Sequence, residues 1–205
     1  HRISDADAKV RLLSVEVLTA LPSVSRIDLI ASRLGDRNQL VRSAARDALI
    51  SLANISEKPF RNAAVRAAES RLVKNDWRAQ EQAGIVLAKL DHDPAAPKIV
   101  PLLRHNDAEV AVAAAWGLRV IANASTYADM LKHANRGDRQ VQQRRSTKAK
   151  SEQLAHLFEA FGQANYRPAE SLIRQQIPKA PIRYPVEEAR AGAVWAMGKF
   201  YAKTK

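Results

Sequence analysis

The sequence predicts an all-α fold, an α-solenoid in which helix pairs repeat along the chain. One apolar pattern recurs at intervals of roughly 31 to 40 residues, and no useful length of chain alternates between apolar and polar residues as a strand would. Aromatic residues make up only 5% of the chain, so we expect a core of small side chains with helices packed closely on helices. The length accommodates about five to six helix pairs.

The repeated helix is clearest in segments 10–21 and 41–52, which read VRLLSVEVLTAL and VRSAARDALISL. On a helical wheel of about 100° per residue, the apolar positions of each segment form one stripe, and charged residues such as Asp47 lie opposite. Six copies of the stripe can be placed. They are Val10, Ser14, Val17, Leu18 and Leu21; Val41, Ala45, Ala48, Leu49 and Leu52; Ala79, Ala83, Val86, Leu87 and Leu90; Val110, Ala114, Gly117, Leu118 and Ile121; the segment 151–162; and Ala189, Ala193, Ala196, Met197 and Phe200.

Shorter apolar segments lie between these copies, at 26–35, 62–72, 96–105 and 168–177. Each can form the partner helix of a pair, with prolines near the starts and connections, where a missing amide costs little. Neither helix of a pair buries enough surface alone, so stacking of pairs completes the core. The sequence therefore predicts a single solenoid over residues 1–205.

Four segments resemble HEAT repeats of the bacterial, phycobilisome-lyase type: 5–21, 36–52, 108–121 and 187–200. The similarity consists of an Asp, then Val-Arg, then a helix like Ala-Ala-Trp-Ala-Leu-Gly, and it covers about residues 5–122 and 150–200. The resemblance implies a right-handed superhelix of HEAT-like helix pairs.

The resemblance also implies a hydrogen-bond ladder between repeats, made by an Asp in the turn and an Arg six residues later. That spacing occurs as Asp5 with Arg11 and as Asp36 with Arg42, and we expect both pairs to be structural. Other residues take the two places in later copies: Lys74 and Gln80, then His105 and Ala111.

One position of the repeat points away from the stripe, toward the predicted inner face of the solenoid. Trp116 and Trp195 share this position, and Asp47 and His156 occupy it in other copies. Because Trp is enriched at binding hot spots, we expect this row to bind a protein or peptide. The alternative is that neighbouring helices bury much of each indole within the core.

The net charge of +12 at pH 7 attracts polyanions, and about half of the excess lies between residues 132 and 150. This polar segment predicts an insertion that interrupts the array, either a long mobile loop or a solvated helix extension. It contains no aromatic residue that could stack on bases, which leaves phosphate attraction. Its candidate polyanion contacts are Arg136, Arg139, Arg144, Arg145, Lys148 and Lys150.

The known catalytic signatures are not found in the sequence. It has no Cys, which excludes disulfides and thiolate metal sites, and it has neither a Gly-x-Ser-x-Gly motif nor a Gly-rich phosphate loop. Its five His residues lack metal-ligand spacing, so we expect neither metal nor cofactor. One enzyme class remains as a minor alternative, the alkylpurine DNA glycosylases built on HEAT-like helices, which use Trp and Asp on a basic concave surface.

The leading hypothesis is a non-catalytic HEAT-repeat scaffold that binds another protein. The alternative is a basic solenoid that binds DNA or RNA. No segment reaches the about 18 uncharged apolar residues of a membrane span, and a cytoplasmic location is slightly favoured. The sequence starts with His1 and enters a helical pattern at once, so we expect it to be part of a longer protein.

Overall fold

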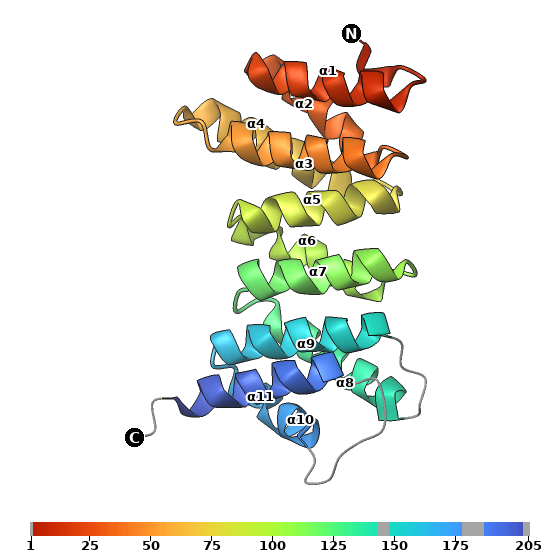
Figure 1. Ribbon diagram of the computed structural model, residues 1–205. Helices are drawn as coiled ribbons and strands as arrows, with labels where there is room; N and C mark the ends of the chain where they lie inside the picture. Colours follow the sequence, from red (N-terminus) through yellow and green to blue (C-terminus); the bar gives the residue numbers. More distant parts are fainter. Residues whose placement is uncertain (1, 143–147, 178–186, 203–205) are drawn as a thin grey trace. The chain divides into compact units, whose positions relative to one another are not determined.

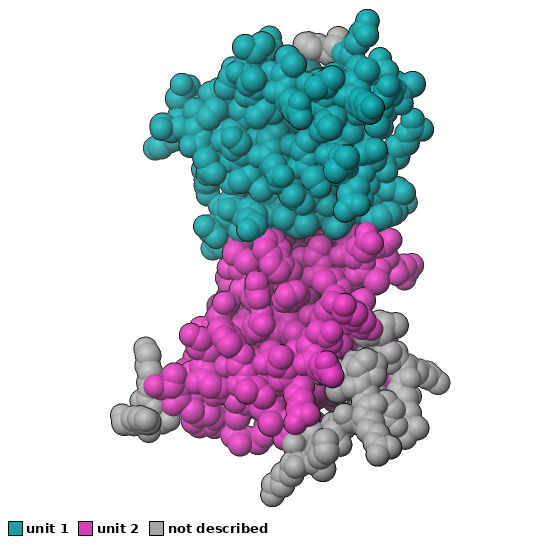
Figure 2. All heavy atoms as spheres, in the orientation of Figure 1, with its two compact units in different colours: residues 1–95 teal, residues 96–205 magenta. Residues whose placement is uncertain are grey.

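The computed structural model describes residues 2–142, 148–177 and 187–202, and every regular element in these ranges is a helix. The prediction of an all-α fold with helices packed in sequence is confirmed. The helices form two compact units, residues 1–95 and residues 96–205 (Figure 2). Each unit is described by itself.

Unit 1 is a stack of three long helices with two helices behind it. The stacked helices are α1 (Ala8–Ala20), α3 (Gln39–Ala53) and α5 (Trp77–Lys89), and each packs on the next (Figure 1). Their partners are α2 (Ile27–Ala31) and α4 (Lys58–Leu72). Helices and partners alternate along the chain, as the sequence predicts for helix pairs.

Unit 2 repeats this arrangement. The stacked helices are α7 (Ala108–Ile121), α9 (Lys148–Gln163) and α11 (Glu187–Tyr201), and their partners are α6 (Ala96–Ile99), α8 (Tyr127–Gln142) and α10 (Glu170–Gln175) (Figure 1). Short 3-10 helices occupy the connections of both units: Arg2–Ser4, Val24–Arg26, Ser32–Gly35, Asp93–Ala95, Val100–Arg104 and Arg167–Ala169.

Four stacked helices begin in the same way. The side chains of Asp7, Asn38, Asp76 and Asp107 accept hydrogen bonds from amides of the first helical turn, which would otherwise lack partners. In each of these helices the apolar stripe begins two residues after the helix start, so the caps and the stripe have the same repeat. The cap therefore sets the register in which each helix meets its neighbour.

The described residues of the basic segment are helical. Residues 132–142 form the second half of α8, and residues 148–150 begin α9. Helix α8 buries Met130, His133, Ala134 and Asp138, which lie on one face at helical spacing. This face gives no clear apolar pattern in the sequence, because two of its buried positions hold polar residues. Residues 143–147, with Arg144 and Arg145, lie outside the described residues.

Helices α9 and α11 approach each other unusually closely at two glycines. A Cβ atom added to Gly192 would lie 2.7 Å from the carbonyl oxygen of Ala155, and one added to Gly162 would lie 2.7 Å from the Cα of Ala196. Any larger side chain at either glycine would force the backbones of α9 and α11 apart. The two glycines therefore fix the distance between the last two stacked helices.

A buried ion pair joins the first two repeats of unit 1. Arg11 on α1 donates from Nε and Nη2 to the two carboxylate oxygens of Asp36, each at 2.8 Å, and the two side chains are only 5% and 3% exposed. Its Nη1 donates to the carbonyl oxygens of Asp5 and Ala6, both at 2.9 Å. Arg11 therefore ties its own helix start to the turn of the following repeat.

The next rung of this ladder is incomplete. Arg42 donates to the carbonyl oxygen of Asp36 at 3.0 Å, as Arg11 does to Asp5. Two residues before the cap of α5, however, stands Lys74, where the preceding repeat has Asp36. Among the described residues, the buried Nε of Arg42 has no hydrogen-bond partner. The ion pair thus belongs to the first two repeats, and later repeats pack without it.

Replacing Gly192 with Ala should lower the free energy of unfolding by about 1 to 3 kcal/mol, because the new methyl group overpacks the α9 backbone. Gly198→Ala is the matched control on the same helix, since nothing lies within 4 Å of its added Cβ. That control should stabilise by about 0.5 to 1 kcal/mol through helix propensity. Urea unfolding of both variants measures the difference, and equal effects would contradict the close contact.

Asp36→Asn should lower the free energy of unfolding by about 3 kcal/mol or more near neutral pH, because it leaves Arg11 buried without its counter-ion. Burial alone raises the pKa of Asp36, but hydrogen bonds from Arg11 and the Asn38 amide, with the charges of Arg11 and Arg33, bring the net pKa below its usual value. The stabilisation is therefore complete above the unfolded pKa of about 3.9 and is lost as pH falls toward the folded pKa.

The test compares unfolding of wild type and Asp36→Asn between about pH 7 and pH 3. Groups common to both proteins cancel in the difference, which should stay constant above about pH 5 and shrink below about pH 4. A difference that does not change with pH would contradict the role of the carboxylate.

Candidate functional site

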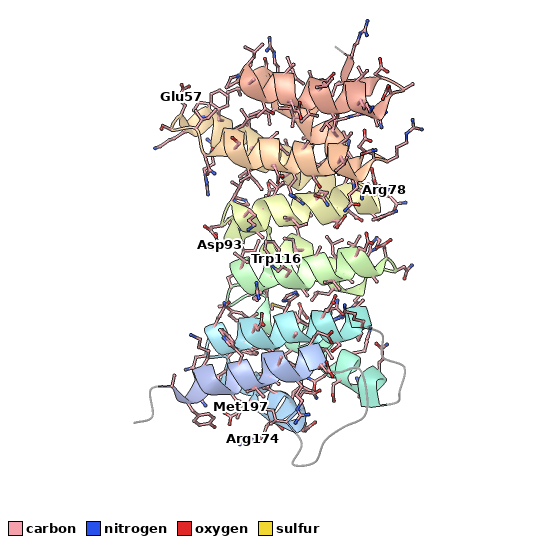
Figure 3. All side chains as sticks on the ribbon, in the orientation of Figure 1. Glu57, Arg78, Asp93, Trp116, Arg174 and Met197 are labelled. Atoms are coloured by element: carbon pink, nitrogen blue, oxygen red, sulfur yellow. The ribbon has the colours of Figure 1, made fainter. Side chains whose placement is uncertain are left out.

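One row of ring side chains crosses the stacked helices of unit 2. Trp116, His156 and Trp195 are each the ninth residue of their helix, on α7, α9 and α11 respectively. Because α9 packs on both α7 and α11, the three residues occupy the same place on three neighbouring helices. Figure 3 labels Trp116 on α7. We call Trp116, His156 and Trp195 the ring row.

Trp195 is both supported and accessible. A Cβ added to Gly162 would lie 3.2 Å from its Cζ3, so the edge of the indole rests over this glycine of α9. The ammonium of Lys199, one turn later on α11, lies 5.1 Å from the ring centroid, within the range of a cation-π interaction. The residue is nevertheless 39% exposed. The ring is thus packed along one edge and partly open to solvent.

Trp116 and His156 are more buried than Trp195. Trp116 is partly buried on α7, and the side chain of His156 is 23% exposed. Burial is the main cause that lowers the pKa of His156, and the charge of Arg119 lowers it further, against a smaller opposing effect of Glu159. The lowered pKa favours the uncharged form of the imidazole. The ring row thus consists of two indoles and one imidazole.

An ion pair borders the row one turn further along the helices. Arg119 on α7 donates to the carboxylate of Glu159 on α9, and the same carboxylate lies 3.6 Å from Nδ1 of His156. The pair joins the two helices and neutralises both charges beside the rings. Aromatic residues within a polar border are also common at protein interfaces.

Asp47 is the residue of unit 1 that the sequence predicts for the same inner face. It holds the equivalent position on α3, is exposed, and accepts a hydrogen bond from its neighbour Arg46 at 2.9 Å. The preceding copy carries Glu16 at this position, on α1, and the following copy carries Ile85, on α5. The aromatic character of the row is a property of unit 2.

The candidate polyanion contacts lie in two different environments, some on the surface and one within the packing of unit 2. Arg136 and Arg139 are exposed on α8, and Lys148 lies 3.6 Å from the carboxylate of Glu152. Lys150 points inward instead: it donates to Gln153 Oε1 at 2.7 Å, and burial lowers its pKa. Lys150 is therefore part of the packing of unit 2 and is poorly placed for a phosphate.

Gln153 is the centre of a buried polar cluster that sequence reasoning missed. Its Nε2 donates to the carbonyl oxygens of Leu103 and Ala111 at 2.9 and 3.1 Å, and its Oε1 lies 3.0 Å from Nε2 of His133. It therefore ties α9 to α7, α8 and the 3-10 helix before α7. A glutamine among charged and apolar residues at the start of a helix gives no signal of this role in the sequence.

The described part of the chain shows no group of three or more His, Asp or Glu residues that could hold a metal ion. Among the described helices, none combines the length and the apolar character that crossing a membrane requires.

Comparison with known proteins supports the fold and goes no further. No protein-family model matches the chain, and no curated protein matches it. Two engineered proteins of known structure, Northeast Structural Genomics Consortium targets OR329 and OR366, are similar in fold. The first has a TM-score of 0.52 and 18% identity over 98% of this chain and 94% of its own. The second has a TM-score of 0.53 and 18% identity over 98% of this chain and 96% of its own.

Truncation of Trp195 should test whether the ring is a surface group. Trp195→Ala should lower the free energy of unfolding by clearly less than about 3 kcal/mol, the lower end for buried aromatic residues. Phe158→Ala on α9 is the reference, because Phe158 is fully buried and should cost about 3 to 5 kcal/mol. Thermal and urea unfolding measure both, and equal losses would place Trp195 in the core.

Proposed function

We propose that this chain is a HEAT-type helical-repeat scaffold without catalytic activity, which binds a protein or peptide through the ring row of unit 2. The observation that carries the proposal is the occurrence of Trp116, His156 and Trp195 at one position of three packed helices. The HEAT assignment is supported by the Asp and Val-Arg pattern of the repeats and by the Arg11 to Asp36 contact between them.

Rigid aromatic groups favour a protein partner. An anchor that is already held in place loses little conformational freedom on binding, so more of its burial contributes to affinity. Gly162 and Lys199 hold the indole of Trp195 in this way, and its open side can cover an apolar side chain of the partner. Arg119, one turn from Trp116, is paired with Glu159, and Lys199, one turn from Trp195, lies against the indole. Neither cation is presented alone to a phosphate backbone.

Nucleic-acid binding is the second candidate, because of the net charge of +12 and the exposed Arg136 and Arg139 on α8. Such binding would be sequence-independent and would weaken steeply with salt. Glycosylase activity has less support. Glu159 lies beside the ring row, 3.6 Å from His156, and its ion pair with Arg119 leaves it poorly placed to stabilise a cationic sugar.

The test is affinity capture from the native host with wild type and with the double variant Trp116→Ala/Trp195→Ala. We expect specific partners of the wild type to be lost from the double variant, because each anchor typically contributes about 2 kcal/mol or more to binding. Trp77→Ala is the control, since Trp77 stands at the start of α5 in unit 1 beside Arg78. The control should keep the partners.

The second part of the experiment measures binding of the wild-type protein to duplex DNA. Wild type should show no binding at physiological salt, whereas a nucleic-acid solenoid would bind with an affinity that falls steeply between about 50 and 200 mM salt. An unchanged partner set in the double variant, with folded protein, would remove the ring row as the binding site.

A further inference from the structure

A pocket lies between the two partner helices of unit 1. Helices α2 and α4 pack on each other, and the pocket between them has a volume of about 480 Å³. This volume falls within the range of about 300 to 1,000 Å³ that is usual for small-molecule sites. Both walls belong to unit 1. The first wall, formed by α2 and the 3-10 helix before it, contributes Val24, Ile27 and Asp28, and the second, formed by α4, contributes Ala63, Arg66, Ala67, Ser70 and Arg71.

The α4 wall brings two cations to the pocket. Its five residues follow one another at steps of three, one, three and one, so they lie on one face of the helix. The two alanines of this face are buried, whereas Arg66 is exposed and Arg71 is partly exposed. Small side chains at the alanine positions therefore leave the space that the two arginines line.

Neither of these guanidinium groups is neutralised within the described chain. Arg11 of the same unit is paired with Asp36, but Arg66 and Arg71 have no such carboxylate partner among the described residues. The Nε of Arg71 is buried and also has no hydrogen-bond partner there. An anion that enters beside a guanidinium partly withdrawn from water supplies the missing counter-charge and accepts from its free N–H groups.

The pocket also contains hydrogen-bond acceptors. The hydroxyl of Ser70 donates to the carbonyl oxygen of Ala67 at 2.7 Å, so its oxygen remains as an acceptor for a ligand. Asp28, on the opposite wall, is exposed and brings a carboxylate. A fitting ligand therefore offers an anionic group to the two arginines and a donor group to these two acceptors.

The charges of the lining favour a singly charged anionic group. Arg66 and Arg71 contribute two positive charges and Asp28 one negative charge, so the lining has a net charge of plus one. A carboxylate balances this charge, whereas a phosphate dianion would place its second negative charge near Asp28 and be repelled. The planar fork of arginine also matches the two oxygens of a carboxylate.

We propose that the pocket between α2 and α4 binds a small organic carboxylate that also carries a hydroxyl or ammonium group. The carboxylate accepts hydrogen bonds from Arg66 and Arg71, and the donor group of the ligand lies against Asp28 and Ser70. Hydroxy acids and amino acids both have this combination of groups. The site lies in unit 1 and is independent of the ring row, so the scaffold has a small-molecule ligand in addition to its protein partner.

The smallest acids of this kind are the probes, because they contain only the recognised groups and no side chain that could clash. Glycolate carries a carboxylate and a hydroxyl, glycine a carboxylate and an ammonium, and acetate a carboxylate alone. NMR titration to about 100 mM at constant ionic strength measures their binding through the side-chain Nε–H signals of the arginines.

Glycolate or glycine should shift the signals of Arg66 and Arg71 with a Kd of about 1 to 30 mM, as expected for so few atoms. Acetate should bind at least about threefold more weakly, because it leaves the two acceptors unpaired. The better of glycolate and glycine identifies the donor group as hydroxyl or ammonium. The absence of a shift at these arginines with both acids would overturn the proposal.

Variants of the arginines test the anionic side of the site. Arg66→Gln removes one charge, and Arg71→Lys keeps the charge but loses the fork, so each should weaken binding at least about fivefold. Lys58→Gln is the matched control, because it removes a positive charge from the exposed start of the same helix, outside the pocket. Thermal unfolding checks that the variants are folded, and Arg66 is exposed, so its replacement leaves the packing intact. Equal losses in all three variants would indicate attraction by net charge and overturn the site.

Asp28→Asn and inorganic phosphate test the other side of the site. Asp28→Asn should strengthen the binding of acetate and remove most of the preference for the acid with a donor group, because the negative charge of the wall is lost. An unchanged preference would overturn the role of Asp28 in binding the donor. Inorganic phosphate should bind the wild type more weakly than the preferred acid. Tighter binding of phosphate at Arg66 and Arg71 would overturn the assignment to a carboxylate.

Discussion

The structure depends on the close packing of each stacked helix on the next through small side chains. Alanine and glycine occupy much of the contact surface, and at Gly162 and Gly192 the backbones of α9 and α11 themselves approach. Small residues bury little area each, so no single helix is stable alone and the contact between neighbours supplies the core. Every other feature of the chain, including the ring row, depends on the register of these contacts.

Polar groups set this register where apolar packing is too uniform to do so. The Arg11 to Asp36 pair in unit 1 and the Gln153 cluster in unit 2 each hold a helix against the backbone of a neighbouring turn. A stripe of alanines can slide along a similar stripe at small cost, but a buried donor that misses its acceptor costs the full desolvation of that group. The ion pair and the glutamine cluster differ in chemistry, but both fix the register of neighbouring helices.

Fixed register has a consequence for function, because it brings equivalent positions of successive helices into rows. The ring row exists since α7, α9 and α11 all place their ninth residue on one surface.

The sequence by itself determined the helical class, the spacing of the stacked helices and the shared position of Trp116 and Trp195, because all three follow from local periodicity and capping. Tertiary structure decided the division into two units, the place of residues 132–142 in α8, and the buried roles of His133, Lys150 and Gln153. These depend on which polar groups find partners across helices. The periodicity of one segment contains no information about the groups that another segment brings to it.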